Sequence, residues 1–140
     1  MPSEHLNYAE EHLLIHDTLT KLNGDILCGT QTTSLYYAAF HCIHELAFTK
    51  HGIALSPRHV DMMKEIDPKR ADCLFQLPRA IYAAFRDMKN ASERSRYGCD
   101  LQVGATRAAL LKADYAETAR NFGIVRNYMV AKGVLQKIVS

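Results

Sequence analysis

The chain has 140 residues and a mass of 15.8 kDa, the size of one ordinary domain. Hydrophobic residues make up 48% and charged residues 23%, so the chain can bury a core, and this composition excludes a disordered protein. The net charge of +2 permits an RNA or nucleotide partner without indicating one. We find neither a basic N-terminus followed by an apolar run nor an apolar run of about 20 residues, so we expect a cytoplasmic protein without membrane contact.

Periodic apolar positions, interrupted by proline and glycine, predict five helical regions, which lie at about 3–22, 32–50, 57–66, 68–95 and 104–132. In the first region the expected inward stripe consists of Tyr8, His12, Ile15, Leu19 and Leu22. Pro78 is expected to kink the fourth region or to split it into a short and a longer helix. No segment alternates with period two, so the fold class is all-α: a single domain over residues 1–140, built as an up-and-down bundle of four to five helices.

The second region is apolar on nearly every side from Ser34 to Leu46, although it carries two tyrosines and two histidines. This pattern is typical of the central helix of a bundle, with Tyr36 and Tyr37 as core anchors whose hydroxyls reach its edge. The last region has a seam at Leu111, Tyr115, Thr118, Phe122, Val125 and Met129. A half-exposed seam of that length would favour a homodimer.

Histidines and cysteines are the candidate metal ligands. His41 and His44 share one helix face with Tyr37, and His12 and His16 stand one turn apart, so a carboxylate from another helix could complete a metal site. Glu11 and Glu45 are the carboxylates closest to these pairs in the sequence. The strict HExxH pattern is absent, so we favour structural histidines and predict no cofactor. Four cysteines without a CxxC pair are interpreted as small buried hydrophobes: Cys28, Cys42, Cys73 and Cys99.

Basic residues are densest near the end of the fourth region, at Arg86, Lys89, Arg94 and Arg96. Tyr97 follows them, and arginines beside an aromatic ring suit phosphate contact with base stacking. Asp87, Glu93 and Asp100 weaken the positive field, so a solvated helix end is the alternative. The residues that we predict to contact a nucleotide or RNA are Arg94, Arg96, Tyr97, Tyr37 and His41.

Several of these segments resemble a HEPN domain, the helical superfamily often paired with minimal nucleotidyltransferases. The resemblance rests on Tyr36-Tyr37-Ala38-Ala39-Phe40 in the second region and on Ser56-Pro57-Arg58-His59 at the short helix. The stretch 92–98 and the long last helix match more loosely. The resemblance implies the HEPN bundle fold, a homodimer, RNA or nucleotide binding, and a nucleotidyltransferase-type partner protein in a toxin–antitoxin or defence-type system.

One departure from the family shapes the functional prediction. Ribonuclease members carry an arginine followed, after four to six residues, by a histidine. Here the first arginine, Arg58, directly precedes the last histidine, His59, so that motif cannot occur. We therefore expect an atypical member that binds RNA, a nucleotide or a partner protein. The alternatives are a ribonuclease toxin with a rearranged site, for which His59, His41 and Arg94 are the catalytic candidates, and a metal-binding helical bundle that uses His12, His16, His41 and His44.

Overall fold

The computed structural model describes residues 4–23, 28–97 and 104–135. These ranges contain five helices and no strand: α1 (Glu4–Asn23), α2 (Cys28–His51), α3 (His59–Ile66), α4 (Arg79–Tyr97) and α5 (Gly104–Ala131). The predicted all-α class is therefore confirmed. Among these helices, none has a stretch of the length and apolarity needed to span a bilayer.

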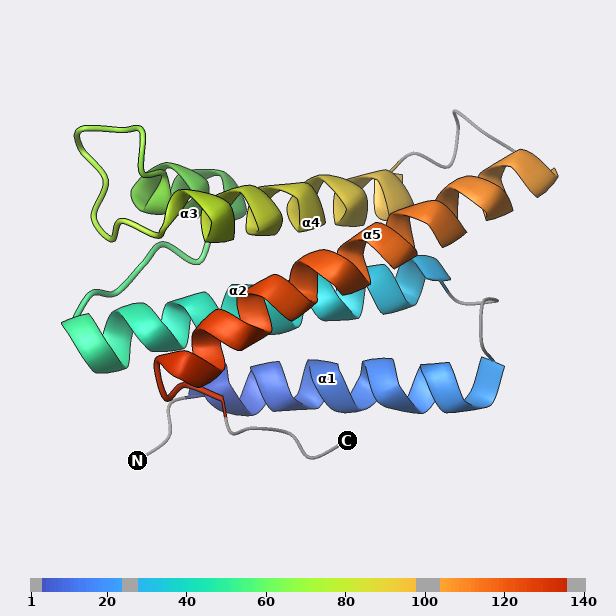
Figure 1. The fold of residues 1–140 in the computed structure, drawn as a ribbon, viewed down its shortest axis with the longest axis horizontal. Coiled ribbons are helices and arrows are strands. Elements are labelled where there is room, and N and C mark those ends of the chain that lie inside the picture. Colours follow the sequence, from blue (N-terminus) through green and yellow to red (C-terminus); the bar gives the residue numbers. More distant parts are fainter. Residues whose placement is uncertain (1–3, 24–27, 98–103, 136–140) are drawn as a thin grey trace.

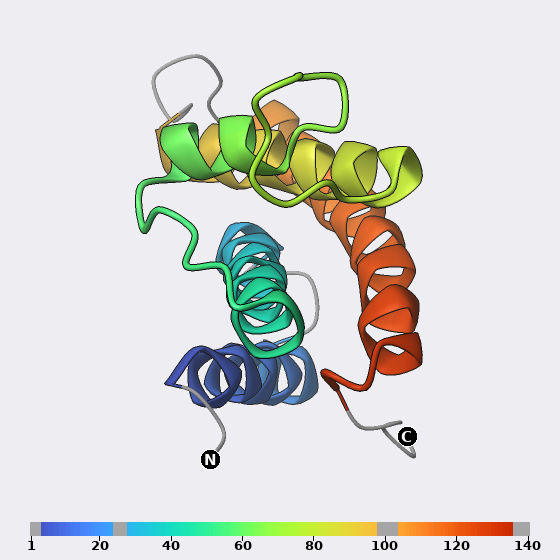
Figure 2. The ribbon, with the colours of Figure 1, turned by 90° about the vertical axis from the view of Figure 1, so that its left-hand side faces the viewer.

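Helix α2 occupies the centre of the bundle. It packs against α1, α4 and α5, and α5 also packs against α4 (Figures 1 and 2). Viewed from the end, α1, α2 and α4 form successive layers, while α5 runs along one side of α2 and α4 (Figure 2). Buried residues occur all around α2 from Leu35 to Ala47, which confirms the prediction of a central helix.

The inward face of α1 differs from the predicted stripe. Tyr8 and Ile15 were expected inside, but 44% and 43% of their surfaces are exposed. The face that meets α2 carries His5, Ala9 and His12, and of these Ala9 is fully buried. The helix is thus rotated relative to the prediction, because its partner surface on α2 is lined with aromatic rings that stack on the α1 histidines.

Two helix starts also differ from the sequence prediction. Helix α2 begins at Cys28, four residues earlier than expected. Helix α3 begins at His59, and Ser56 does not cap its N-terminus through a side-chain hydrogen bond, since Arg58 is the N-cap residue. Instead the Ser56 hydroxyl accepts the Arg58 N–H at 3.1 Å, and the Ser56 N–H donates to Glu65 at 2.7 Å. These two bonds fold the preceding loop against α3.

The prediction of helix in the first part of the fourth region was wrong. Residues 67–78 form turns, and α4 starts directly after Pro78, whose carbonyl accepts the first helical hydrogen bond from Tyr82 at 2.9 Å. The apolar stripe persists through Leu77 and Ile81, which are buried, but Leu74 is 55% exposed. Proline cannot donate within a helix, so it marks the start of α4 rather than a kink inside a longer helix.

The seam of α5 lies in the core as expected. Thr118, Phe122, Val125 and Met129 are buried, and Tyr115 is half-buried against the bundle. Because the seam is used within the chain, it no longer argues for a homodimer, which stays a prediction. The cysteine interpretation holds for Cys28 and Cys42, which are buried.

Burial also governs the chemistry of Cys42, since it raises the pKa of this thiol to about 12 and keeps it protonated. Cys73 is half-buried. Cys99 lies outside the described residues.

The turns before α4 supply a test of the core. Leu77 is fully buried, so Leu77→Ala should lower the free energy of unfolding by about 2–5 kcal/mol through lost contacts and a cavity. Leu74→Ala, a matched change three residues away, should alter it by less than about 0.5 kcal/mol because Leu74 is exposed. Urea unfolding of both variants measures the difference. Equal losses would contradict the turn structure of residues 67–78.

Candidate functional site

Five of the seven histidines lie on or around α2, contributed by α1, α2 and the start of α3: His5, His12, His41, His44 and His59. Two adjacent tyrosines of α2, Tyr36 and Tyr37, lie among these rings. The other two histidines lie elsewhere, His16 beside Tyr115 of α5 and His51 beside Phe75. The grouping arises because α1 and α2 both present histidines to their shared interface.

Four of these rings form a contiguous set, which we call the histidine stack: His5, His12, His41 and His44. The ring of His5 lies parallel to that of His44, with centroids 4.5 Å apart, and its Nδ1 is 2.8 Å from Nδ1 of His41. The ring of His12 stacks on His41 with centroids 5.9 Å apart. A hydrogen bond between two Nδ1 atoms requires one ring to donate and the other to accept. His5 and His41 therefore cannot both be protonated while this hydrogen bond is formed.

Burial disfavours a charge on three rings of the histidine stack by lowering the pKa values of His41, His44 and His12. Burial, together with the neighbouring His5, lowers the pKa of His41 to about 4 and that of His44 to about 3. Burial also lowers the pKa of His12, although Glu11 opposes this shift. Desolvation disfavours the protonated ring, and each histidine disfavours charge on the next. Neutral rings can pack closely, which fixes α1 on α2.

A second contact ties α3 to α2. The Tyr36 hydroxyl forms a hydrogen bond with Nδ1 of His59, and the His59 ring stacks on Phe40 with centroids 4.6 Å apart. Burial raises the pKa of Tyr36, so its phenol stays protonated. Burial lowers the pKa of His59, and the nearby Arg96 and Lys89 lower it further. Because Tyr36 occupies Nδ1, Nε2 is the nitrogen through which half-buried His59 can meet a ligand.

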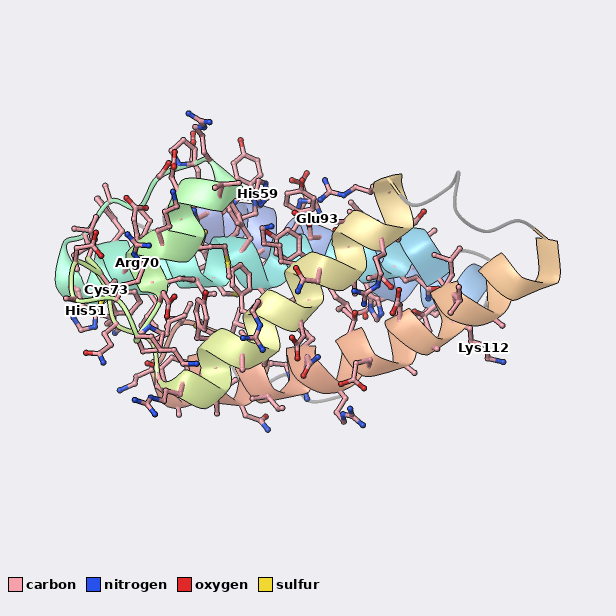
Figure 3. The ribbon with its side chains drawn as sticks, turned by 90° about the horizontal axis from the view of Figure 1, so that it is seen from above. His51, His59, Arg70, Cys73, Glu93 and Lys112 are labelled. Atoms are coloured by element: carbon pink, nitrogen blue, oxygen red, sulfur yellow. The ribbon has the colours of Figure 1, made fainter. Side chains whose placement is uncertain are left out.

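Arg96 reaches the same place from α4. Its Nη1 donates to the Tyr37 hydroxyl at 2.9 Å, its Nε donates to the Ser92 carbonyl at 3.4 Å, and its guanidinium carbon lies 5.5 Å from the centre of the Tyr37 ring. On the same face of α4, Lys89 pairs with Glu93. Figure 3 shows His59 on α3 and Glu93 on α4 near each other on the upper side of the molecule. We call the set His59, Tyr37, Lys89, Glu93 and Arg96 the Arg96 cluster.

Four basic residues of α4 do not all lie on one face of the helix, although they are close in sequence: Arg86, Lys89, Arg94 and Arg96. Arg94 forms a bidentate ion pair with Asp114 of α5, at 3.0 and 3.1 Å, on a different face of α4 from Arg96. Arg86 pairs with Asp87. Two residues along a helix correspond to about 200° of rotation, so Arg94 and Arg96 cannot face the same ligand easily. The side chain of Tyr97 lies outside the described residues.

The four histidines predicted as metal ligands, His12, His16, His41 and His44, do not lie around a common point. His12 faces the stack, whereas His16 donates to or accepts from the Tyr115 hydroxyl at 2.7 Å and contacts Asp17 at 3.1 Å. In the part of the chain that the structure describes, no three or more histidine, cysteine, aspartate or glutamate side chains are arranged to hold a metal ion. Helix α1 instead uses His12 and His16 to contact two different helices.

Sequence reasoning brought Tyr37, His41 and Arg96 into the candidate site, and these residues do lie close to one another or to shared neighbours. It overlooked His5, which contacts both His41 and His44. A signal was present, because His5, Ala9, His12 and His16 recur at spacings of four, three and four along α1. Apolarity favours a different inward face, the one that carries Tyr8 and Ile15, and the sequence prediction therefore used that face.

Comparison of the chain with protein-family models, with curated protein sequences and with solved structures gives no match. The function is therefore inferred from the geometry of the histidine stack and of the Arg96 cluster.

The histidine stack makes stability depend on pH. The unfolded chain takes up protons on His44 below about pH 6.5, whereas the folded chain resists this down to about pH 3. The contribution of the neutral ring is thus fully present above pH 6.5 and is lost as the pH falls toward 3, at about 1.4 kcal/mol per pKa unit. His44→Phe should flatten the fall of the melting temperature between pH 6.5 and 4.

His51→Phe serves as the control, because this exposed ring lies outside the histidine stack. Thermal melts followed by circular dichroism across that pH range give the comparison. An unchanged slope in His44→Phe would show that the stack does not set the acid sensitivity.

Proposed function

We propose that the protein binds RNA or a nucleotide by holding a phosphate group at the Arg96 cluster. One observation carries the proposal: Arg96 of α4 and His59 of α3 converge on Tyr37 and Tyr36, two consecutive residues of α2. An arginine fork and an imidazole N–H are both good phosphate donors, and the tyrosine ring adds a face on which a base can stack.

The charges around this place favour one phosphate. Lys89 and Arg96 contribute two positive charges and Glu93 contributes one negative charge, while the neighbouring histidines are held neutral. The charges of these three described side chains sum to +1 at neutral pH. Half-burial of Arg96 and His59 lowers the local dielectric, which strengthens a contact with an anion.

The resemblance to HEPN domains supports this proposal. In the ribonuclease members of that superfamily an arginine and a histidine act together, and this chain lacks their sequence motif. A comparable pair arises here from separate helices, Arg96 and His59, beside the Tyr36-Tyr37 segment on which the resemblance rests. A toxin–antitoxin or defence role with a nucleotidyltransferase-type partner follows from the same resemblance.

Two arginines on α4 allow a matched test of RNA binding. Arg96→Ala should weaken binding of a short single-stranded RNA by about tenfold or more, because it removes a charged donor at the cluster. It should also reduce the slope of log K against log salt by about 0.7, the loss of one phosphate contact on a single strand. Fluorescence anisotropy at several salt concentrations measures both quantities.

Arg94→Ala is the control, with the same charge change two residues away but in an exposed ion pair with Asp114. We expect RNA affinity within about twofold of wild type and a stability loss of at most about 1 kcal/mol. Equal weakening by the two variants would point to a general effect of charge and would count against the Arg96 cluster.

RNA cleavage is the second candidate function, and the contact between Tyr36 and His59 favours it. In the tautomer in which Nδ1–H of His59 donates to Tyr36, Nε2 is unprotonated and can act as a general base. It would take the proton of a ribose 2′-hydroxyl, the 2′-oxygen would bond to phosphorus, and the bond to the 5′-oxygen would break, with water supplying its proton. Arg96 would stabilise the charge that develops on the phosphate.

Cleavage assays separate binding from catalysis. If His59 is the base, His59→Gln should reduce cleavage of a labelled RNA by about 100-fold or more while leaving RNA affinity within a few fold. His51→Gln, on the exposed end of α2, is the matched control. No cleavage by folded wild-type protein would eliminate the catalytic candidate and leave the binding proposal intact.

A further inference from the structure

A pocket of about 320 Å³ opens beside the histidine stack, at the end of the molecule where α1 begins and α2 ends. Its walls come from three places: the first turns of α1, the last turns of α2, and the segment that follows α2. The lining residues are Glu4, His5, Tyr8, His44, Phe48, Ile53, Ala54 and Leu55. The volume lies within the range of small-ligand sites.

The wall after α2 is held by a defined helix end. Gly52 adopts a φ of +67°, and the N–H of Ile53 donates to the Ala47 carbonyl at 2.9 Å. This left-handed turn reverses the chain, so that residues 53–55 face the beginning of α1. The pocket is therefore a built feature of the fold rather than a gap between loops.

Aromatic rings dominate the pocket. The ring of His5 is stacked on that of His44, and Tyr8 and Phe48 remain 44% and 57% exposed although they line a hollow. Exposed aromatic side chains around a cavity are typical of a surface that receives a flat ring. Ile53 and Leu55 add apolar contact area.

Glu4 sets the hydrogen-bonding preference of the pocket. Among the described lining residues Glu4 is the one that carries a carboxylate, and a carboxylate repels phosphate but accepts hydrogen bonds from N–H groups. His44 is 4% exposed, and its Nε2 has no hydrogen-bond partner among the described residues. Because that nitrogen is itself buried, Glu4 is the one of these two groups that can bond to a ligand without rearrangement of the wall.

We propose that this pocket receives a nucleobase that carries an exocyclic amino group, with the base stacked on the aromatic rings and its amino group bonded to Glu4. The inference rests on the proposed function, because it supplies the base-recognising half of the RNA site whose phosphate half is the Arg96 cluster. Carboxylates accept hydrogen bonds from amino groups of bases in this manner, and stacking on aromatic side chains adds affinity for any base.

The two halves lie along one face of α2. Tyr37, His41 and His44 follow one another at spacings of four and three residues, and Tyr37 contacts Arg96 while His44 lines the pocket. Seven residues of helix correspond to about 10 Å. A short oligonucleotide that crosses His41 can therefore reach both places.

Uncharged nucleosides test the pocket without any phosphate contact. Cytidine and uridine form one matched pair, and adenosine and inosine form another, since in each pair the second member has a carbonyl in place of the amino group. Wild-type protein should bind the amino members at least about fivefold more tightly, as followed by NMR titration. Glu4→Gln should reduce this preference to about twofold or less, and Phe48→Ala should weaken all four by about fivefold or more.

Leu14→Ala is the control, because Leu14 is exposed on α1 and does not line the pocket. Its nucleoside binding should match wild type. Glu4 and Phe48 are both exposed, so their variants should retain the wild-type melting temperature within a few degrees.

Three outcomes would overturn the inference: equal binding within each pair, no effect of Phe48→Ala, or no nucleoside binding at millimolar concentrations. A change in self-association of Phe48→Ala with unaltered nucleoside binding would assign the pocket to a second copy instead. If RNA binding depends on Arg96 but nucleosides do not bind, the proposed function stands and this inference fails. If nucleosides bind with the stated preference but RNA does not, the reverse holds.

Discussion

The central position of α2 is the constraint on which the rest of the structure depends. Helices on three sides remove water from it, yet it carries tyrosines and histidines along the segment that is most buried. A polar group in such a place must find a partner or lose its charge. Here both happen: the tyrosine hydroxyls find His59 and Arg96, and the rings of His41 and His44 are held neutral. The orientation of α1 follows, because α1 covers the rings on α2 with the stacked rings of His5 and His12.

The same constraint places a histidine and an arginine close together at one edge of the bundle. The rings of Tyr36 and Tyr37 both lie beside His59 of α3, while the Tyr36 hydroxyl bonds to His59 and the Tyr37 hydroxyl bonds to Arg96 of α4. Each hydroxyl forms a hydrogen bond with a different basic side chain, His59 or Arg96. These two bonds connect α3 and α4 to the same part of α2. The proposed phosphate site is therefore a consequence of satisfying buried polar groups, and structural and functional roles of these residues are not alternatives. Substituting either tyrosine would be expected to disturb both.

Helix α4 illustrates why residues adjacent in sequence can have separate roles. Lys89, Glu93 and Arg96 follow one another at four and three residues and share a face toward His59. Arg94 lies on another face and pairs with Asp114 of α5. The rotation of the helix thus divides the basic residues of this segment between a group that faces His59 and a contact between helices. The distinction was available from helical periodicity but needed the positions of α3 and α5 to acquire a meaning.

Local patterns along the chain were enough to predict the all-α class, the central helix, the α5 seam and most helix ends, because periodicity, proline and glycine act over a few residues. They misplaced the inward face of α1 and extended the fourth helix across residues 67–78, where Pro78 marks a beginning instead of a kink. They also pointed to Tyr37, His41, His59 and Arg96 as separate candidates. The pairings that make a site join residues 23, 36 and 59 positions apart: Tyr36 with His59, His5 with His41, and Tyr37 with Arg96. Such contacts depend on how whole helices pack, which no local pattern encodes, so only the folded chain could bring these side chains together.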